Sequence, residues 1–90
     1  MTVHAAKDGT IVLSGICPVE DAEALVRLLL ADPSAEVDWR TCDLAHTAVV
    51  QVLLACGRRT RGPPRARFLR DWIEPLLASS VDHLPLQRKA

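Results

Sequence analysis

The sequence predicts a small open α/β domain, with a sheet of three to four strands and about three helices. Three observations predict this fold class. An Asp-Gly turn precedes a β-branched run at residues 10–14, as in an antiparallel hairpin. Apolar residues then recur with helical spacing over about residues 19–31. A second strand and a second helix follow at residues 35–39 and 45–56, and this order favours a right-handed parallel βαβ crossover.

Residues 2–6 and 10–14 are expected to pair as the antiparallel hairpin. The turn between them contains Asp8-Gly9, which tolerates the positive φ that hairpin turns require. The segment 15–18 ends in proline. We expect this segment to leave the sheet and lead into the first helix.

The first helix is expected over about residues 19–31. Its first turn is acidic, which the helix dipole favours at an amino terminus. The apolar stripe consists of Ala22, Leu25, Val26 and Leu29. Leu28 and Leu30 widen this surface beyond one stripe, so the helix is either covered on two sides or presents an exposed apolar strip to a partner.

The second strand and helix are the stretch around which the chain is organised. The strand is expected to be short, from residue 35 to Trp39, and a polar connection follows at residues 40–44. In the helix at residues 45–56, Gln51 is almost the only polar residue beyond the first turn, so most of its surface must be buried. Gly57 follows as a stop signal.

The polar first turn of that helix is the candidate binding site. In an open α/β sheet, the junction between a strand and the following helix lies on an exposed rim. Asp43, His46 and Thr47 belong to this junction. From its position alone, Thr47 is expected to cap or line the helix.

The same stretch resembles the signature of the STAS domain, the fold of anti-sigma-factor antagonists and of the cytosolic part of sulfate transporters. In that family a hydrophobic-Asp-hydrophobic strand end leads to Asp-Ser-(Ser/Ala)-Gly at the helix start, and the first Ser is phosphorylated in switching members. Val37-Asp38-Trp39 would match the strand end, and His46-Thr47-Ala48-Val49 the tetrapeptide. Thr47 keeps a hydroxyl at the phosphorylated position, whereas His46 replaces Asp and Val49 replaces Gly.

The resemblance spans about residues 10–57 and implies a bacterial regulatory module that binds a protein, such as a kinase-like switch protein, a transporter or another signalling component. It adds Asp38 to Asp43, His46 and Thr47 as expected contact residues. The alternative is a phosphoacceptor in a signalling relay, at Thr47 or His46. We expect no enzyme, metal or cofactor, because the sequence has no phosphate loop, metal-ligand spacing or catalytic-triad order.

Arginine dominates the chain after residue 57. The candidate anion-binding side chains are Arg58, Arg59, Arg61, Arg65 and Arg67, since Arg pairs bidentately with phosphate. Zero net charge and three aromatic residues argue against nucleic acid as a partner, so nucleic-acid binding through residues 58–70 ranks last. Residues 1–57 hold three basic and eight acidic side chains (net −5), and residues 58–90 hold eight and three (net +5). Each half therefore offers a face to a partner of opposite charge.

A final helix is predicted from apolar pairs that recur every four residues. The pairs are Phe68 and Leu69, Trp72 and Ile73, and Leu76 and Leu77. This stripe is expected to pack on the sheet or on another helix, with Pro75 removing one backbone hydrogen bond. Before this helix, residues 58–61 are a candidate edge strand. Residues 1–78 are expected to form one domain, and residues 79–90 a weakly ordered tail.

Cysteine usage and hydropathy indicate a cytoplasmic protein. The three cysteines include no Cys-x-x-Cys pair, so neither a disulfide framework nor a zinc site is indicated. For Cys42 we favour an exposed or half-buried loop thiol over a thiolate-imidazole pair with His46. No apolar stretch approaches the ~20 residues of a membrane span, and the amino terminus lacks a signal-peptide pattern. The shortened sheet and the broad apolar helix make a homodimer plausible.

Overall fold

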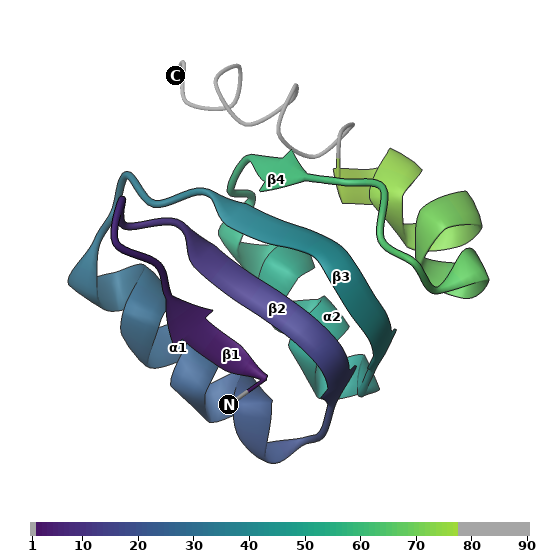
Figure 1. The fold of residues 1–90 in the computed structure, drawn as a ribbon, viewed down its shortest axis with the longest axis horizontal. Helices are drawn as coiled ribbons and strands as arrows, with labels where there is room; N and C mark the ends of the chain where they lie inside the picture. The colour runs from purple at the N-terminus through teal and green to yellow at the C-terminus, as the bar shows by residue number, and fades with distance from the viewer. Residues whose placement is uncertain (1, 78–90) are drawn as a thin grey trace.

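The computed structural model describes residues 2–77 as an open four-stranded sheet with two helices against one face (Figure 1). The strands are β1 (Val3–Ala5), β2 (Ile11–Cys17), β3 (Val37–Ala45) and β4 (Thr60–Arg61), in the spatial order β1-β2-β3-β4. β1 is antiparallel to β2, and the other neighbours are parallel. Helices α1 (Glu20–Ala31) and α2 (Thr47–Cys56) lie behind the sheet in Figure 1. The predicted fold class is confirmed; the predicted tail lies outside the described residues.

The hairpin turn is built as predicted, but β2 is longer than predicted. Gly9 has φ 89°, and the Asp8 carboxylate accepts a hydrogen bond from the Thr10 amide at 2.9 Å. Residues 15–17 were expected to leave the sheet, and this prediction is wrong. They stay in β2 because they pair with β3, with Gly15 opposite Cys42 and Cys17 opposite Ala45.

β3 is also longer than predicted, and the expected polar connection at residues 40–44 is strand. The register with β2 shifts twice, between Val12 and Ser14 and between Gly15 and Ile16. Such irregularities place extra residues in one strand and interrupt its alternation of inward and outward side chains. Polar residues therefore follow each other in β3 without ending it.

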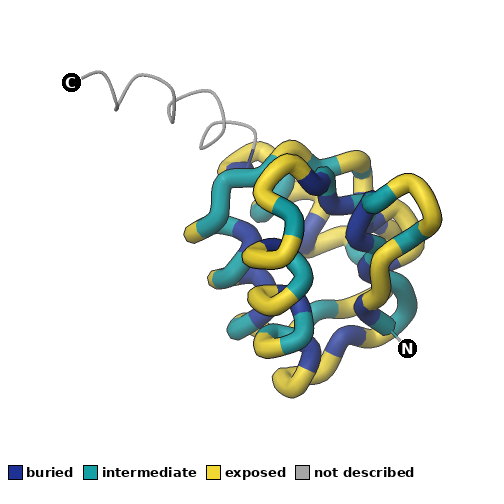
Figure 2. Tube along the Cα trace, turned by 90° about the vertical axis from the view of Figure 1, so that its left-hand side faces the viewer, coloured by how far each residue is buried: buried dark blue, intermediate teal, exposed yellow. Residues whose placement is uncertain are grey.

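The core lies between the sheet and the two helices. Its largest fully buried side chain is Trp39, and the remainder is mainly aliphatic. Leu25 and Leu29 of α1 and Val49 and Leu53 of α2 face this core, while the exposed residues of both helices lie on their outer sides (Figure 2). In residues 2–77, none of the helices combines the length and the apolar character that crossing a membrane requires.

The carboxyl-terminal helix covers residues 67–77 and contains a π-helical turn, η1 (Leu69–Ile73). Leu69 and Leu77 are buried. The prediction that the whole apolar stripe packs is wrong, because Phe68, Trp72 and Leu76 are 63%, 68% and 53% exposed. Two adjacent residues of a helix point in different directions, and the domain covers only one side of this helix. One member of each apolar pair is therefore exposed to solvent.

Candidate functional site

His46 is the amino-terminal cap of α2. Its Nδ1 accepts a hydrogen bond from the Ala48 amide at 3.0 Å, and its carbonyl oxygen accepts one from the Val49 amide at 2.9 Å. The His46 amide donates to the carbonyl of Cys17, the last residue of β2, at 2.9 Å. These contacts fix the start of α2 against the end of the sheet. Because Nδ1 accepts, the proton of the neutral ring is on Nε2.

Thr47 is the first residue of α2 and is exposed. Within the described residues, its hydroxyl has no hydrogen-bond partner. It lies in the first turn of α2, where the helix dipole favours a negative group. A phosphate on this hydroxyl would therefore be compatible with the folded helix.

Large apolar side chains lie on the same rim. Ile16 of β2 and Leu44 of β3 are register partners and are 63% and 56% exposed. Val19, the residue before α1, is also exposed. We call Ile16, Val19 and Leu44 the rim patch. Sequence analysis missed it because Ile16 was assigned to a turn and Leu44 to a connection, and only the pairing of β2 with β3 brings them together.

Asp43 lies beside the rim patch near the end of β3. Its carboxylate is half-exposed and forms an ion pair with Arg65, with 3.6 Å between Oδ1 and Nη1. Asp43 thus belongs to the same end of the sheet as His46 and Thr47, as predicted. The ion pair between Asp43 and Arg65 also connects the rim to the segment that leads into the carboxyl-terminal helix.

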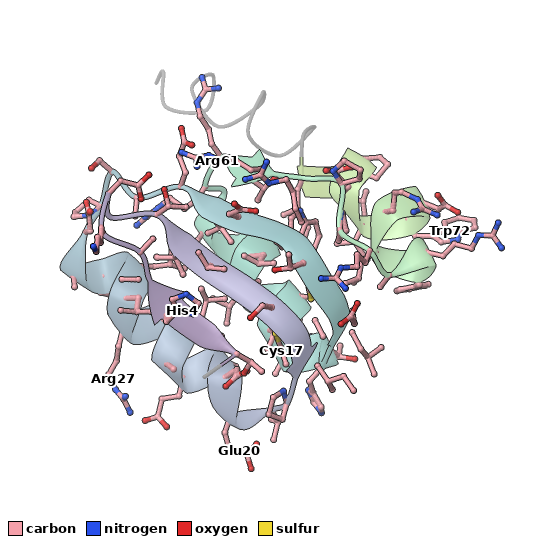
Figure 3. The ribbon with its side chains drawn as sticks, viewed as in Figure 1. His4, Cys17, Glu20, Arg27, Arg61 and Trp72 are labelled. Carbon is pink, nitrogen blue, oxygen red and sulfur yellow. The ribbon has the colours of Figure 1, made fainter. Side chains whose placement is uncertain are left out.

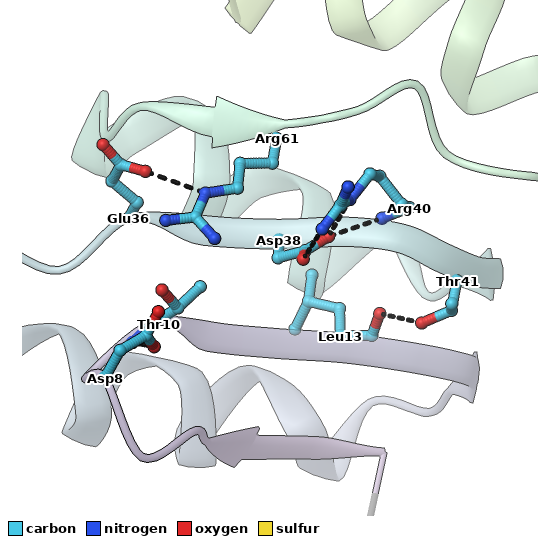
Figure 4. Close-up of polar contacts among 8 residues, drawn as sticks. All are labelled: Asp8, Thr10, Leu13, Glu36, Asp38, Arg40, Thr41 and Arg61. Atoms are coloured by element: carbon cyan, nitrogen blue, oxygen red, sulfur yellow. Dashed lines mark hydrogen bonds and ion pairs between the residues drawn. The ribbon is translucent and has the colours of Figure 1, made fainter.

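Asp38 lies elsewhere. It is the second residue of β3, about 20 Å from the strand end at the usual rise per residue. The prediction that Val37-Asp38-Trp39 ends the strand is therefore wrong. Arg40 binds Asp38 bidentately, at 3.0 Å from Nε to Oδ1 and 2.7 Å from Nη2 to Oδ2 (Figure 4). This side-chain contact holds the pKa of Asp38 below its ordinary value.

The five candidate anion-binding arginines do not converge on one site. Arg58 donates to backbone carbonyls at the end of α1. Arg61 pairs with Glu36 at 3.0 Å (Figure 4), and Arg67 lies 4.0 Å from Asp71. Arg65 contacts Asp43, and Arg59 is exposed. Their spacing along the sequence suggested a cluster, but the fold directs them to different partners.

Cys42 is a buried strand residue, which corrects its expected place in a loop. Its Sγ lies 3.5 Å from the Leu44 carbonyl oxygen, a geometry in which the thiol donates. Contact with the Cys42 thiol, together with burial, raises the pKa of the Cys17 thiol far above its ordinary value. No group of three or more potential metal ligands occurs among residues 2–77.

Comparison of the chain with protein-family models, curated proteins and solved structures found no match. The chemistry of the site is therefore inferred from its geometry. The rim combines exposed apolar side chains, an exposed hydroxyl and a carboxylate. This mixture is typical of surfaces that contact other proteins, where an apolar centre is surrounded by polar groups.

Proposed function

We propose that this chain is a non-catalytic, STAS-like regulatory module that acts in the cytoplasm and binds a protein partner through the rim at the start of α2. The observation that carries the proposal is the exposed pair of Ile16 and Leu44. These large apolar side chains lie opposite each other on neighbouring strands and are both more than half exposed. Grouped apolar side chains that remain in water indicate a contact surface.

Two further features support this proposal. The cap formed by His46 orders the first turn of α2 and leaves the Thr47 hydroxyl exposed next to the rim patch. The resemblance of His46-Thr47-Ala48-Val49 to the STAS tetrapeptide lies at this same turn. Physical exposure and sequence resemblance therefore point to one surface.

Affinity purification from the source cells tests the proposal. We expect a specific protein to be recovered with the wild-type chain and lost with Leu44→Asp, because a carboxylate in the apolar contact would be desolvated. Thr47→Glu should also weaken its recovery. Leu30→Asp is the matched control, since Leu30 is even more exposed but lies near the end of α1. A partner set unchanged by Leu44→Asp would contradict the proposal.

A second candidate function is that of a phosphoacceptor at Thr47, favoured by its exposed hydroxyl. Phosphate would add up to two negative charges beside the rim patch and thereby change what the rim binds. Peptide mass spectrometry of the protein from its source cells tests this, with Thr47→Ala as the control. A consistently unmodified Thr47 would exclude a relay through Thr47 but leave the partner-binding proposal intact.

A further inference from the structure

The carboxyl-terminal helix presents a second apolar surface. Phe68, Trp72 and Leu76 recur every four residues and therefore lie along one side of the helix. All three are more than half exposed. In Figure 3 the Trp72 side chain points away from the domain. We call these three residues the exposed stripe.

Positive charge surrounds the exposed stripe. Arg65, Arg67 and Arg70 are exposed, and the last two share the single carboxylate of Asp71 at 4.0 and 3.6 Å. Glu74 does not offset them at the stripe, because its carboxylate is directed toward Gly62, where it would contact an added Cβ. The stripe is thus apolar and flanked by cations.

The rim patch has the opposite charge. Glu20 and Glu23 in the first turn of α1 follow Val19, and Asp43 precedes Leu44. Within the chain, Glu23 pairs with Arg27 at 3.2 Å and Asp43 pairs with Arg65 at 3.6 Å. Among the described residues, this leaves Glu20 at the rim, whereas Arg67 and Arg70 face one carboxylate, that of Asp71, at the stripe. The two surfaces are therefore complementary, since each is apolar and their flanking charges are of opposite sign.

One chain cannot bring its own two surfaces together. The helix holds Leu69 and Leu77 against the core, and its exposed stripe faces outward. The surfaces are nevertheless neighbours, because Arg65, three residues before the stripe, pairs with Asp43 at the rim. A two-fold axis next to this boundary would place the stripe of each copy on the rim of the other.

We propose that the chain forms a reciprocal homodimer, in which the exposed stripe of each copy covers the rim patch of the other. Two identical contacts close such an assembly, so it does not extend into a filament. This inference rests on the proposed function, because it covers the same rim that the partner is proposed to bind. Self-association would then compete with partner binding and keep the rim covered until a partner displaces the stripe.

Sedimentation velocity of the full chain over a range of concentrations tests the dimer. We expect Trp72→Ser and Leu44→Ser each to raise the dissociation constant at least about tenfold, because each removes an apolar anchor from both contacts. Leu30→Ser, at a still more exposed position on α1, is the control and should leave the dissociation constant unchanged. Added salt should weaken the wild-type dimer, since its flanking charges are near the surface.

Mixing the two variants gives the decisive result. A Trp72→Ser chain retains its rim, and a Leu44→Ser chain retains its stripe, so a mixed pair has one intact contact. We expect the mixture to associate more strongly than either variant alone. A dimer abolished by Trp72→Ser but unaffected by Leu44→Ser would indicate a stripe-on-stripe contact and overturn the proposal.

A wild-type chain that stays monomeric at all concentrations would also overturn the proposal. Failure of the dimer can be distinguished from failure of the proposed function, because the Trp72→Ser chain keeps the rim patch intact and can be used in the affinity purification. Recovery of a partner by that variant, together with loss of the partner in Leu44→Asp, would retain the partner-binding rim without the dimer.

Discussion

Arg58 closes the carboxyl-terminal end of α1 by donating a hydrogen bond from Nη2 to the carbonyl oxygen of Leu29 at 2.9 Å. Its Nη1 lies 3.0 and 3.3 Å from the carbonyl oxygens of Asp32 and Ala35. α1 has no basic residue in its own last turn. The guanidinium therefore supplies the positive charge and the donors that a helix terminus requires.

We expect Arg58→Ala to lower the free energy of unfolding by about 2 kcal/mol, because backbone carbonyls lose a charged donor. Urea unfolding followed by circular dichroism measures the change. Arg59→Ala is the matched control, since Arg59 is the exposed neighbour and should change stability by less than about 0.5 kcal/mol. Equal effects of the two substitutions would contradict the capping role.

His46→Ala should destabilise the protein by about 1 kcal/mol, because the Ala48 amide loses its acceptor at the start of α2. His46→Asp should retain the stability, since a carboxylate is a good cap and is favoured by the helix dipole. Thermal unfolding of the two variants at neutral pH measures both effects. An His46→Ala chain as stable as wild type would show that the hydrogen bond contributes nothing.

Asp38→Asn should reduce stability at pH 7 by about 1 kcal/mol, because Arg40 loses its charged partner. Folding lowers the pKa of Asp38 below its ordinary 3.8, so its ionised form stabilises the native state above that pH. The contribution should be lost as pH falls through the lowered value. Unfolding measured from pH 7 into the acid range should show the difference between the variant and wild type narrowing below pH 3.8, whereas a constant difference would contradict the assignment.

Thiol labelling should distinguish Cys56 from the other two cysteines. Cys56 is partly exposed, while Cys17 and Cys42 are buried. At neutral pH we expect a maleimide to modify Cys56 first and the buried pair only on unfolding, because the reagent needs access and the raised pKa keeps Cys17 protonated. Mass spectrometry of the labelled peptides checks this order. Rapid modification of Cys17 in the native state would contradict it.

The sequence alone predicted correctly those features that depend on residues adjacent in the chain. Asp8-Gly9 specifies its turn locally, and Gly57 ends α2 with φ 61°, as expected of a helix stop. The position of β4 was also anticipated within residues 58–61. The start of β3 was predicted, but its extension through residues 40–45 was not, because its register shifts interrupt the alternation by which a strand is recognised.

The same distinction applies to the site. His46 and Thr47 were correctly placed at the start of a helix, a local feature. The rim patch depends on the pairing of Ile16 with Leu44, which are far apart in the sequence. Arg58 was misinterpreted for the same reason, since its carbonyl partners lie 23 to 29 residues earlier in the chain.

The two tryptophans occupy opposite environments, since Trp39 is fully buried and Trp72 is 68% exposed. Intrinsic fluorescence therefore contains two separable signals. Acrylamide should quench Trp72 readily and leave Trp39 protected, so a Trp72→Phe chain would report unfolding alone. In a Trp39→Phe chain that remains folded, a blue shift of the emission would signal that the carboxyl-terminal helix has been covered, without any attached dye.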